Sequence, residues 1–133
     1  GNHRFSFSIT SHKSGWKNGV RFGKEANEKL FAVVDPSKYV DVSLNESMSF
    51  LSIEPENIIV SAFKKAEDEN GVVVRLYNVN EDETEVKLNF SEDFKKAWHT
   101  NLIEEKEKEL MIRNKEIRFK IGNQSIETIL LTK

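Results

Sequence analysis

Residues 58–78 read IIVSAFKKAEDENGVVVRLYN, and this stretch decides the fold. Two runs rich in β-branched and aromatic residues, 58–64 and 71–77, flank a polar segment that ends in Asn70-Gly71. Such runs fit a pleated and packed surface, and an Asn-Gly pair tolerates the positive φ values that tight hairpin turns require. The stretch therefore predicts an antiparallel β-hairpin.

The same pattern continues along the chain. In residues 84–90, Val86, Leu88 and Phe90 alternate with polar residues, which is typical of a strand with one buried face. We expect further strands at 50–54, within 94–102 and at 126–131, and a last hairpin that pairs 110–112 with 117–121 around a turn at 113–115. About seven short strands without intervening helices predict an all-β fold, an antiparallel immunoglobulin-like β-sandwich.

A run of alternating charges, EEKEKE at residues 104–109, interrupts the apolar pattern. Mixed charges discourage the pairing of exposed strands between molecules. The run therefore predicts a solvated loop or an edge strand rather than a binding surface.

The first 45 residues differ in character from the rest. Phe5, Phe7 and Ile9 alternate as in a strand, and the apolar spacing within 19–31 predicts a short helix despite Gly19 and Gly23. Residues 35–38 read as a turn and 39–49 as a linking strand or loop. We therefore expect two parts: residues 1–45, with an N-terminal strand, a turn and a short helical arm, and residues 46–133, which form the β-sandwich.

Composition excludes several classes of partner. The chain has 20 Lys and Arg against 22 Asp and Glu, which gives a net charge of −2 and argues against nucleic acid. No run of 18 apolar residues is present, so we expect no membrane contact. The absence of cysteine excludes disulfides and agrees with a cytoplasmic location. His3, His12 and His99 lie too far apart in sequence to present a histidine-based zinc site.

The sequence offers no catalytic residue. Its glycines fit no nucleophile elbow, phosphate loop or dinucleotide turn, and most acidic clusters lie in turns. Four glutamates, Glu54, Glu85, Glu116 and Glu127, fall inside strand patterns, where we expect them to face solvent.

Two residues near the N-terminus are candidate contacts for a sugar. His12 and Trp16 flank Lys13-Ser14-Gly15, and an exposed indole beside polar groups can stack on a sugar ring. The alternative is that Trp16 packs on a core or on a neighbouring domain while His12 bonds to backbone. Trp98, within a strand pattern, predicts core packing.

The order of these segments resembles that of the glycoside hydrolase family 38 α-mannosidases. In that family a strand of the type H-x-F-x-Y/F precedes a PHxGxW turn, and a C-terminal segment carries N-V-V-L-S-A-x-K-x-A-E-D and L-R-L-Y-N. The matching residues here are His3–Ile9, Ser11–Trp16, Asn57–Asp68, Gly71–Asn78 and Ile126–Leu131. Ser11 stands where the family commonly has proline.

The resemblance implies a C-terminal fragment of a retaining, zinc-assisted α-mannosidase. The implied zinc and nucleophile belong to a catalytic domain that is not in these residues, so the resemblance gives no catalytic, cofactor-binding or metal-binding residue here. The implied role is non-catalytic: the fragment supports its own catalytic domain, contributes to the substrate cleft, and has no activity alone. A free-standing module that binds mannose-containing glycans and a protein-interaction sandwich are the alternatives. A homodimer formed through the strand at 5–9 is a further expectation.

Overall fold

The computed structural model describes residues 1–28, 30–32, 47–67 and 71–133, and within them the chain forms two compact units. One unit spans residues 1–45 and the other residues 46–133. Each is described by itself. None of the described helices is long and apolar enough to cross a membrane.

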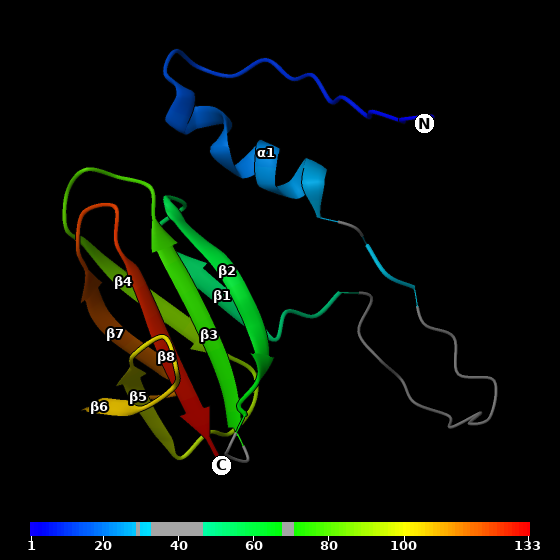
Figure 1. Ribbon diagram of the computed structural model, residues 1–133. Helices are drawn as coiled ribbons and strands as arrows, with labels where there is room; N and C mark the ends of the chain where they lie inside the picture. Colours follow the sequence, from blue (N-terminus) through cyan, green and yellow to red (C-terminus); the bar gives the residue numbers. More distant parts are fainter. Residues whose placement is uncertain (29, 33–46, 68–70) are drawn as a thin grey trace, which may run out of the picture. The chain divides into compact units, whose positions relative to one another are not determined.

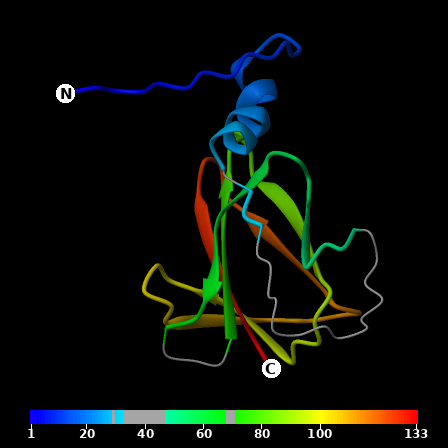
Figure 2. The same ribbon diagram turned by 90° about the vertical axis from the view of Figure 1, so that its right-hand side faces the viewer.

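The described residues of the second unit form eight strands, which are drawn as arrows in Figures 1 and 2. They are β1 (Leu51–Glu54), β2 (Ile58–Lys65), β3 (Gly71–Asn78), β4 (Thr84–Phe90), β5 (Lys96–Thr100), β6 (Lys106–Leu110), β7 (Glu116–Ile121) and β8 (Ile126–Thr132). One sheet has the order β1-β4-β7 and the other the order β2-β3-β8-β5-β6, with every pair antiparallel. The predicted all-β antiparallel sandwich is confirmed.

The core lies between the two sheets and follows the period-two pattern of the sequence. In β4, Val86, Leu88 and Phe90 are buried, and they face inward residues of the other sheet such as Leu76 and Ile129. Because alternate side chains of a strand point to opposite faces, the polar residues between them reach solvent. Burial of these apolar side chains is the main source of the stability of the sandwich.

The predicted hairpin of β2 and β3 is present. Ile58 lies opposite Asn78 and Lys65 opposite Val72, with a bulge between Val60 and Ala62. The tip of this hairpin, residues 68–70, lies outside the described residues, as does most of the segment 35–49 for which a turn and a linking strand or loop are predicted.

A buried asparagine forms hydrogen bonds to the β1–β2, β3–β4 and β7–β8 connections at one end of the sandwich. Asn78 is fully buried, and its Nδ2 donates to the carbonyl oxygens of Asp82 and Gly122, both at 2.9 Å. Its Oδ1 accepts from Asn80 N and from Asn57 Nδ2, also at 2.9 Å. The side chain therefore replaces the water that these buried polar groups would otherwise need.

Two sequence predictions about individual strands are wrong. Segments 110–112 and 117–121 do not pair with each other: β6 pairs with β5, whereas β7 pairs with β4 in the other sheet. The turn itself is present, because Asn114 and Lys115 have positive φ and Arg113 bridges Glu116. It carries the chain from one sheet to the other instead of closing a hairpin.

The second correction concerns the first unit. Residues 5–9 form no strand, because an alternating segment needs a neighbouring strand to bond with and the described residues pair none with it. The predicted short helix is confirmed as α1 (Val20–Asn27), which follows a 3₁₀ turn, Trp16–Gly19. Arg21 and Glu25 form an ion pair one helical turn apart, at 2.9 Å.

Candidate functional site

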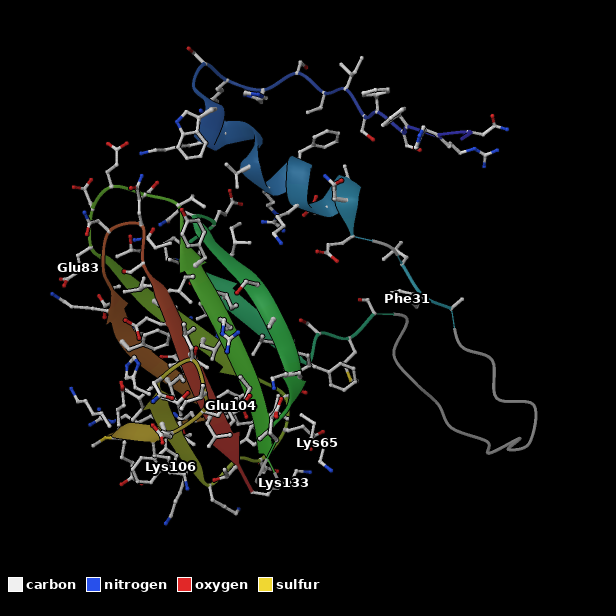
Figure 3. All side chains as sticks on the ribbon, viewed as in Figure 1. Phe31, Lys65, Glu83, Glu104, Lys106 and Lys133 are labelled. Atoms are coloured by element: carbon white, nitrogen blue, oxygen red, sulfur yellow. The ribbon has the colours of Figure 1, made fainter. Side chains whose placement is uncertain are left out.

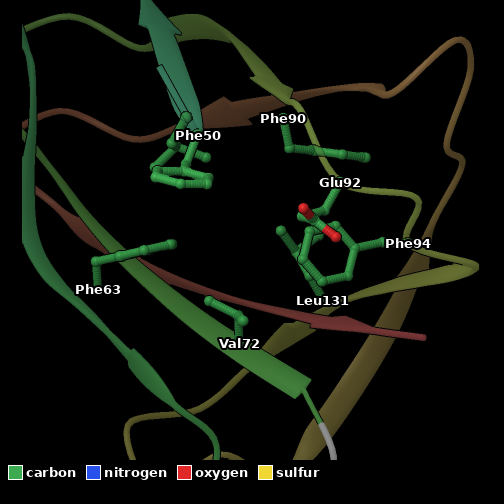
Figure 4. A pocket seen from close by; sticks show the side chains of 8 residues that line it. Phe50, Phe63, Val72, Phe90, Glu92, Phe94 and Leu131 are labelled. Atoms are coloured by element: carbon green, nitrogen blue, oxygen red, sulfur yellow. The ribbon is translucent and has the colours of Figure 1, made fainter. Parts of the chain in front are cut away.

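An apolar pocket opens along one side of the sandwich, between β1 and β2 (Figure 4). Its volume is about 260 Å³, and the two sheets and the β4–β5 connection form its wall. The lining residues are Phe50, Leu51, Phe63, Val72, Phe90, Glu92, Phe94 and Leu131. We call these residues, together with strands β1 and β2, the open edge.

The open edge exists because each sheet ends there. β1 is the last strand of its sheet and β2 the last strand of the other, so inward side chains of these strands have a neighbour on one side only. Phe50 and Phe63 consequently remain 57% and 55% exposed. Phe90 and Phe94 make an edge-to-face contact, with ring centres 5.3 Å apart.

An ion pair borders this pocket at Glu92. Glu92 is the ionisable residue of the lining, and its carboxylate lies 3.3 Å from Lys133 Nζ. At the next residue, the carboxylate of Asp93 lies 3.1 Å from Lys115 Nζ, which also donates to the carbonyl oxygen of Ser91 at 2.8 Å. The pocket therefore has an apolar lining with one paired carboxylate.

A loop covers part of the outer face of the larger sheet. The loop 101–105 is closed by Asn101, whose Oδ1 accepts from the backbone N–H groups of Ile103 and Glu105 at 3.1 and 3.0 Å. Arg75 Nη2 donates to the carbonyl oxygen of Leu102 at 3.0 Å, which holds the loop over β3.

Glu104, which is labelled in Figure 3, connects this loop to β2 and to the residues that follow it. Its carboxylate accepts from Lys64 Nζ at 2.6 Å and from the backbone N–H of Glu67 at 3.0 Å. The hydrogen bond from Lys64, followed by that from Glu67, lowers the pKa of Glu104, and the same contact with Glu104 raises the pKa of Lys64. These groups stabilise a surface loop, and their pKa values move away from those of a catalytic acid or base.

Trp98 packs as the sequence predicts, although on the outer face of the sheet. It lies against the buried cluster of Ala66, Val73 and Leu130, and Lys106 Nζ lies 5.2 Å from its ring centre. Neighbouring His99 points to the inner face, where its Nδ1 lies 3.2 Å from the carboxylate of Glu127. The His99 ring is perpendicular to the Phe119 ring, with ring centres 5.1 Å apart. Both residues contribute to packing.

The prediction that the four strand glutamates face solvent is wrong for Glu127, which lies opposite the buried Leu76 on the inner face and contacts His99 at 3.2 Å. Glu54 and Glu85 are exposed as expected. Glu116 accepts from Arg118 Nε at 2.6 Å, which lowers the pKa of Glu116. Within the described ranges, no group of three His, Asp or Glu side chains could hold a metal ion.

His12 and Trp16 lie in the first unit, around the turn that precedes α1. His12 Nδ1 is 2.7 Å from the carbonyl oxygen of Lys13, and its ring lies so close to Gly19 that a Cβ there would be 2.8 Å from Nε2. Trp16 is 61% exposed, and Lys17 Nζ lies 5.9 Å from the centre of its ring. Sugar contact by these two residues stays a prediction.

Sequence reasoning missed the open edge. Its phenylalanines, Phe50, Phe63, Phe90 and Phe94, resemble ordinary core residues, because a sequence does not show which strands end a sheet. One available signal is the contrast in charge between the apolar run 58–63 and the run 104–109.

These features define an antiparallel β-sandwich domain with an apolar pocket along one edge. Residues 57–129, more than half of the chain, match the family described as the glycosyl hydrolases family 38 C-terminal beta sandwich domain. The chain belongs to this family. It is also similar to Alpha-mannosidase G of Dictyostelium discoideum, with 30% identity over 79 residues. That match covers 58% of this chain and 7% of the relative, so the chain spans a small fraction of that protein's length.

Proposed function

We propose that this chain is the non-catalytic C-terminal domain of an α-mannosidase, in which it supports the catalytic domain and contributes to the substrate cleft. The observation that carries the proposal is the family match over 57–129, since that family is a C-terminal β-sandwich of glycosyl hydrolases. The similarity to Alpha-mannosidase G supports the choice of activity for the whole enzyme.

The chemistry of the described carboxyl groups agrees with a supporting role. A glycosidase needs a carboxylic acid whose pKa is raised, so that it holds a proton at neutral pH. Hydrogen bonds from Lys64 and Arg118 lower the pKa of Glu104 and of Glu116, respectively. Both therefore stay ionised, which suits ion pairing and not proton donation.

The zinc that the family resemblance implies belongs, in this proposal, to the catalytic domain of the parent enzyme. No cluster of ligands in the described part of this chain fits it. The domain would act by packing, and its partner would be the catalytic domain of its own chain. The absence of cysteine is the ground for expecting a cytoplasmic location.

One observation favours a second candidate, a module that binds mannose-containing glycans. Trp16 exposes most of its indole at the surface of its unit, and exposed indoles stack on sugar rings. In that case the indole of Trp16 would provide most of the affinity for the sugar.

Two measurements on the chain alone separate the candidates. We expect no hydrolysis of 4-nitrophenyl α-mannoside and no heat of binding with mannose or manno-oligosaccharides at millimolar concentration. Binding that disappears in a folded Trp16→Ala variant would favour the glycan-binding module. Hydrolysis by the isolated chain would overturn the supporting role.

The gene provides the decisive test of the parent activity. We expect the reading frame upstream of residue 1 to encode a domain of several hundred residues with a His-x-Asp motif and a catalytic aspartate. A start codon directly at this point would contradict the proposal.

A further inference from the structure

The two sides of the sandwich differ sharply in charge. On one side the larger sheet ends in β6, whose sequence KEKEL alternates charged residues and leaves them exposed. On the other side it ends in β2, whose first six residues, IIVSAF, carry no charge and include Val60, 38% exposed, and Phe63; its last two residues are lysines. Charged edges resist the addition of another strand, whereas a long apolar edge accepts one.

The backbone of β2 can form hydrogen bonds with one more strand. β2 is eight residues long and pairs with β3, and no described strand pairs with its far side. In an antiparallel pair, about half of a strand's N–H and C=O groups point away from its partner. An added strand would bond to these groups.

The pocket behind β2 suits side chains better than a free ligand. Its volume of about 260 Å³ lies below the roughly 300–1,000 Å³ of typical small-molecule sites. It runs along the edge, between Phe63 of β2 and Phe50 beside β1, so that a strand laid on β2 would direct every second side chain into it (Figure 4).

We propose that the open edge binds one extended strand, supplied by another part of a larger α-mannosidase chain, with apolar residues at alternate positions and a basic residue at one end. This inference rests on the proposed function. Main-chain bonds to β2 would supply affinity and the phenylalanine pocket would select the apolar side chains. The carboxylate of Glu92, which lies 3.3 Å from Lys133 Nζ, would receive the basic residue in place of that lysine.

Two observations indicate which strand would bind: the carboxylate of Glu92 at the pocket, and the length of the relative compared with this domain. The match occupies 7% of Alpha-mannosidase G, so a chain of that kind carries most of its residues outside this domain. A strand tethered in the same chain is present at high effective concentration, which favours it over a separate partner.

The probe is a labelled peptide with the sequence of residues 3–10, HRFSFSIT, which has the required alternation and a basic end. The chain tested carries Phe5→Ser, Phe7→Ser and Ile9→Ser, so that its own copy of the sequence does not compete. These side chains are 76%, 88% and 96% exposed, so their loss leaves the sandwich intact. Fluorescence anisotropy measures binding, and a peptide with serine at the three apolar positions is the control.

Two variants of that chain locate the site. Phe63→Lys places a charge at the open edge, and we expect it to weaken peptide binding by about tenfold or more. Ile126→Lys is the matched control: Ile126 is 52% exposed, belongs to the same sheet and does not line the pocket. It should change the affinity by less than about twofold.

Hydrogen exchange gives a second readout that needs no variant at Phe63. The peptide should slow exchange of the amides in β2 and leave those of β6 unchanged. The proposal is overturned if the peptide does not bind, or if it binds Phe63→Lys as tightly as the parent. It is also overturned if light scattering shows a dimer that Phe63→Lys dissociates, because the occupant is then a second copy. None of these results depends on the upstream reading frame, so this inference can fail while the proposed function stands.

Discussion

Replacement of Gly71 should destabilise the sandwich, because the backbone of β8 lies very close to its Cα. A Cβ at this position would lie 2.5 Å from the carbonyl oxygen of Leu131, and 3.1 and 3.2 Å from side-chain carbons of Thr132 and Leu130. Ordinary carbon–oxygen contacts begin at about 3.3 Å, so Gly71→Ala requires the strands to separate locally by about 0.8 Å. The obstructing atom belongs to the backbone of β8, which cannot rotate away.

The cost follows from where this contact lies. Gly71 is paired with Thr132 at one end of the seven-residue ladder between β3 and β8. Overpacking of this kind costs about 1–3 kcal/mol, and the reduced entropy of the unfolded chain returns about 0.5 kcal/mol. We therefore expect Gly71→Ala to lower the free energy of unfolding by about 2 kcal/mol, which corresponds to a fall in Tm of about 8–16 °C for a domain of this size.

Gly122→Ala is the matched control. Its Cβ would meet Ser125 Oγ at 2.7 Å, which is the tip of a small side chain, and that hydroxyl makes no hydrogen bond in the described part of the chain. Rotation of Ser125 relieves the contact, so we expect a loss below about 0.5 kcal/mol. Thermal and urea unfolding followed by circular dichroism measure both variants. Equal stability of Gly71→Ala and the wild type, or equal losses in the two variants, would refute the reasoning.

Two further predictions concern polar groups. Asn78→Ala removes the hydrogen-bond partner of the carbonyl oxygens of Asp82 and Gly122 and of the N–H of Asn80. The substitution should therefore lower the free energy of unfolding, measured in urea, by about 2–4 kcal/mol. A loss below about 1 kcal/mol would show that water replaces the side chain. Glu104 has a pKa below its unfolded value of about 4.3, so its contribution to stability is complete above that pH and is lost as the pH falls through the folded pKa. Glu104→Gln should therefore be less stable than the wild type near pH 6, and the difference should shrink towards pH 3; a difference that is constant with pH would contradict this.

The strands of the sandwich could be predicted because each carries its own evidence. Val86, Leu88 and Phe90 alternate with polar residues, and this local pattern fixes the buried face of β4. The charged run 104–109 likewise indicates an exposed strand, which is β6 at the edge of its sheet. Both inferences depend only on residues that are neighbours in the sequence.

Pairing between strands could not be predicted in the same way. Ile112 and Ile117 flank a tight turn and suggest a hairpin, yet β6 and β7 belong to different sheets. The choice depends on which sheet has room for each strand, and this is decided by β4 and β5 earlier in the chain. Gly71 shows the same limit: the sequence indicates a turn residue, whereas its contact with the carbonyl of Leu131, sixty residues away, requires the glycine.

The candidate site was beyond sequence reasoning for a related reason. His12 and Trp16 stand out by residue type, and their role stays a prediction. The phenylalanines of the open edge do not stand out, because Phe63 differs from a core residue only in lacking a neighbour on one side of β2.

The position of β8 bears on how this protein is made. β8 is the last of the eight strands to leave the ribosome, yet it lies in the middle of the larger sheet, bonded to β3 on one side and β5 on the other. Until it emerges, the nascent chain holds two separate hairpins with apolar faces that nothing joins. Deletion of β8 would therefore leave a product for chaperones and proteases, and not a slightly smaller domain.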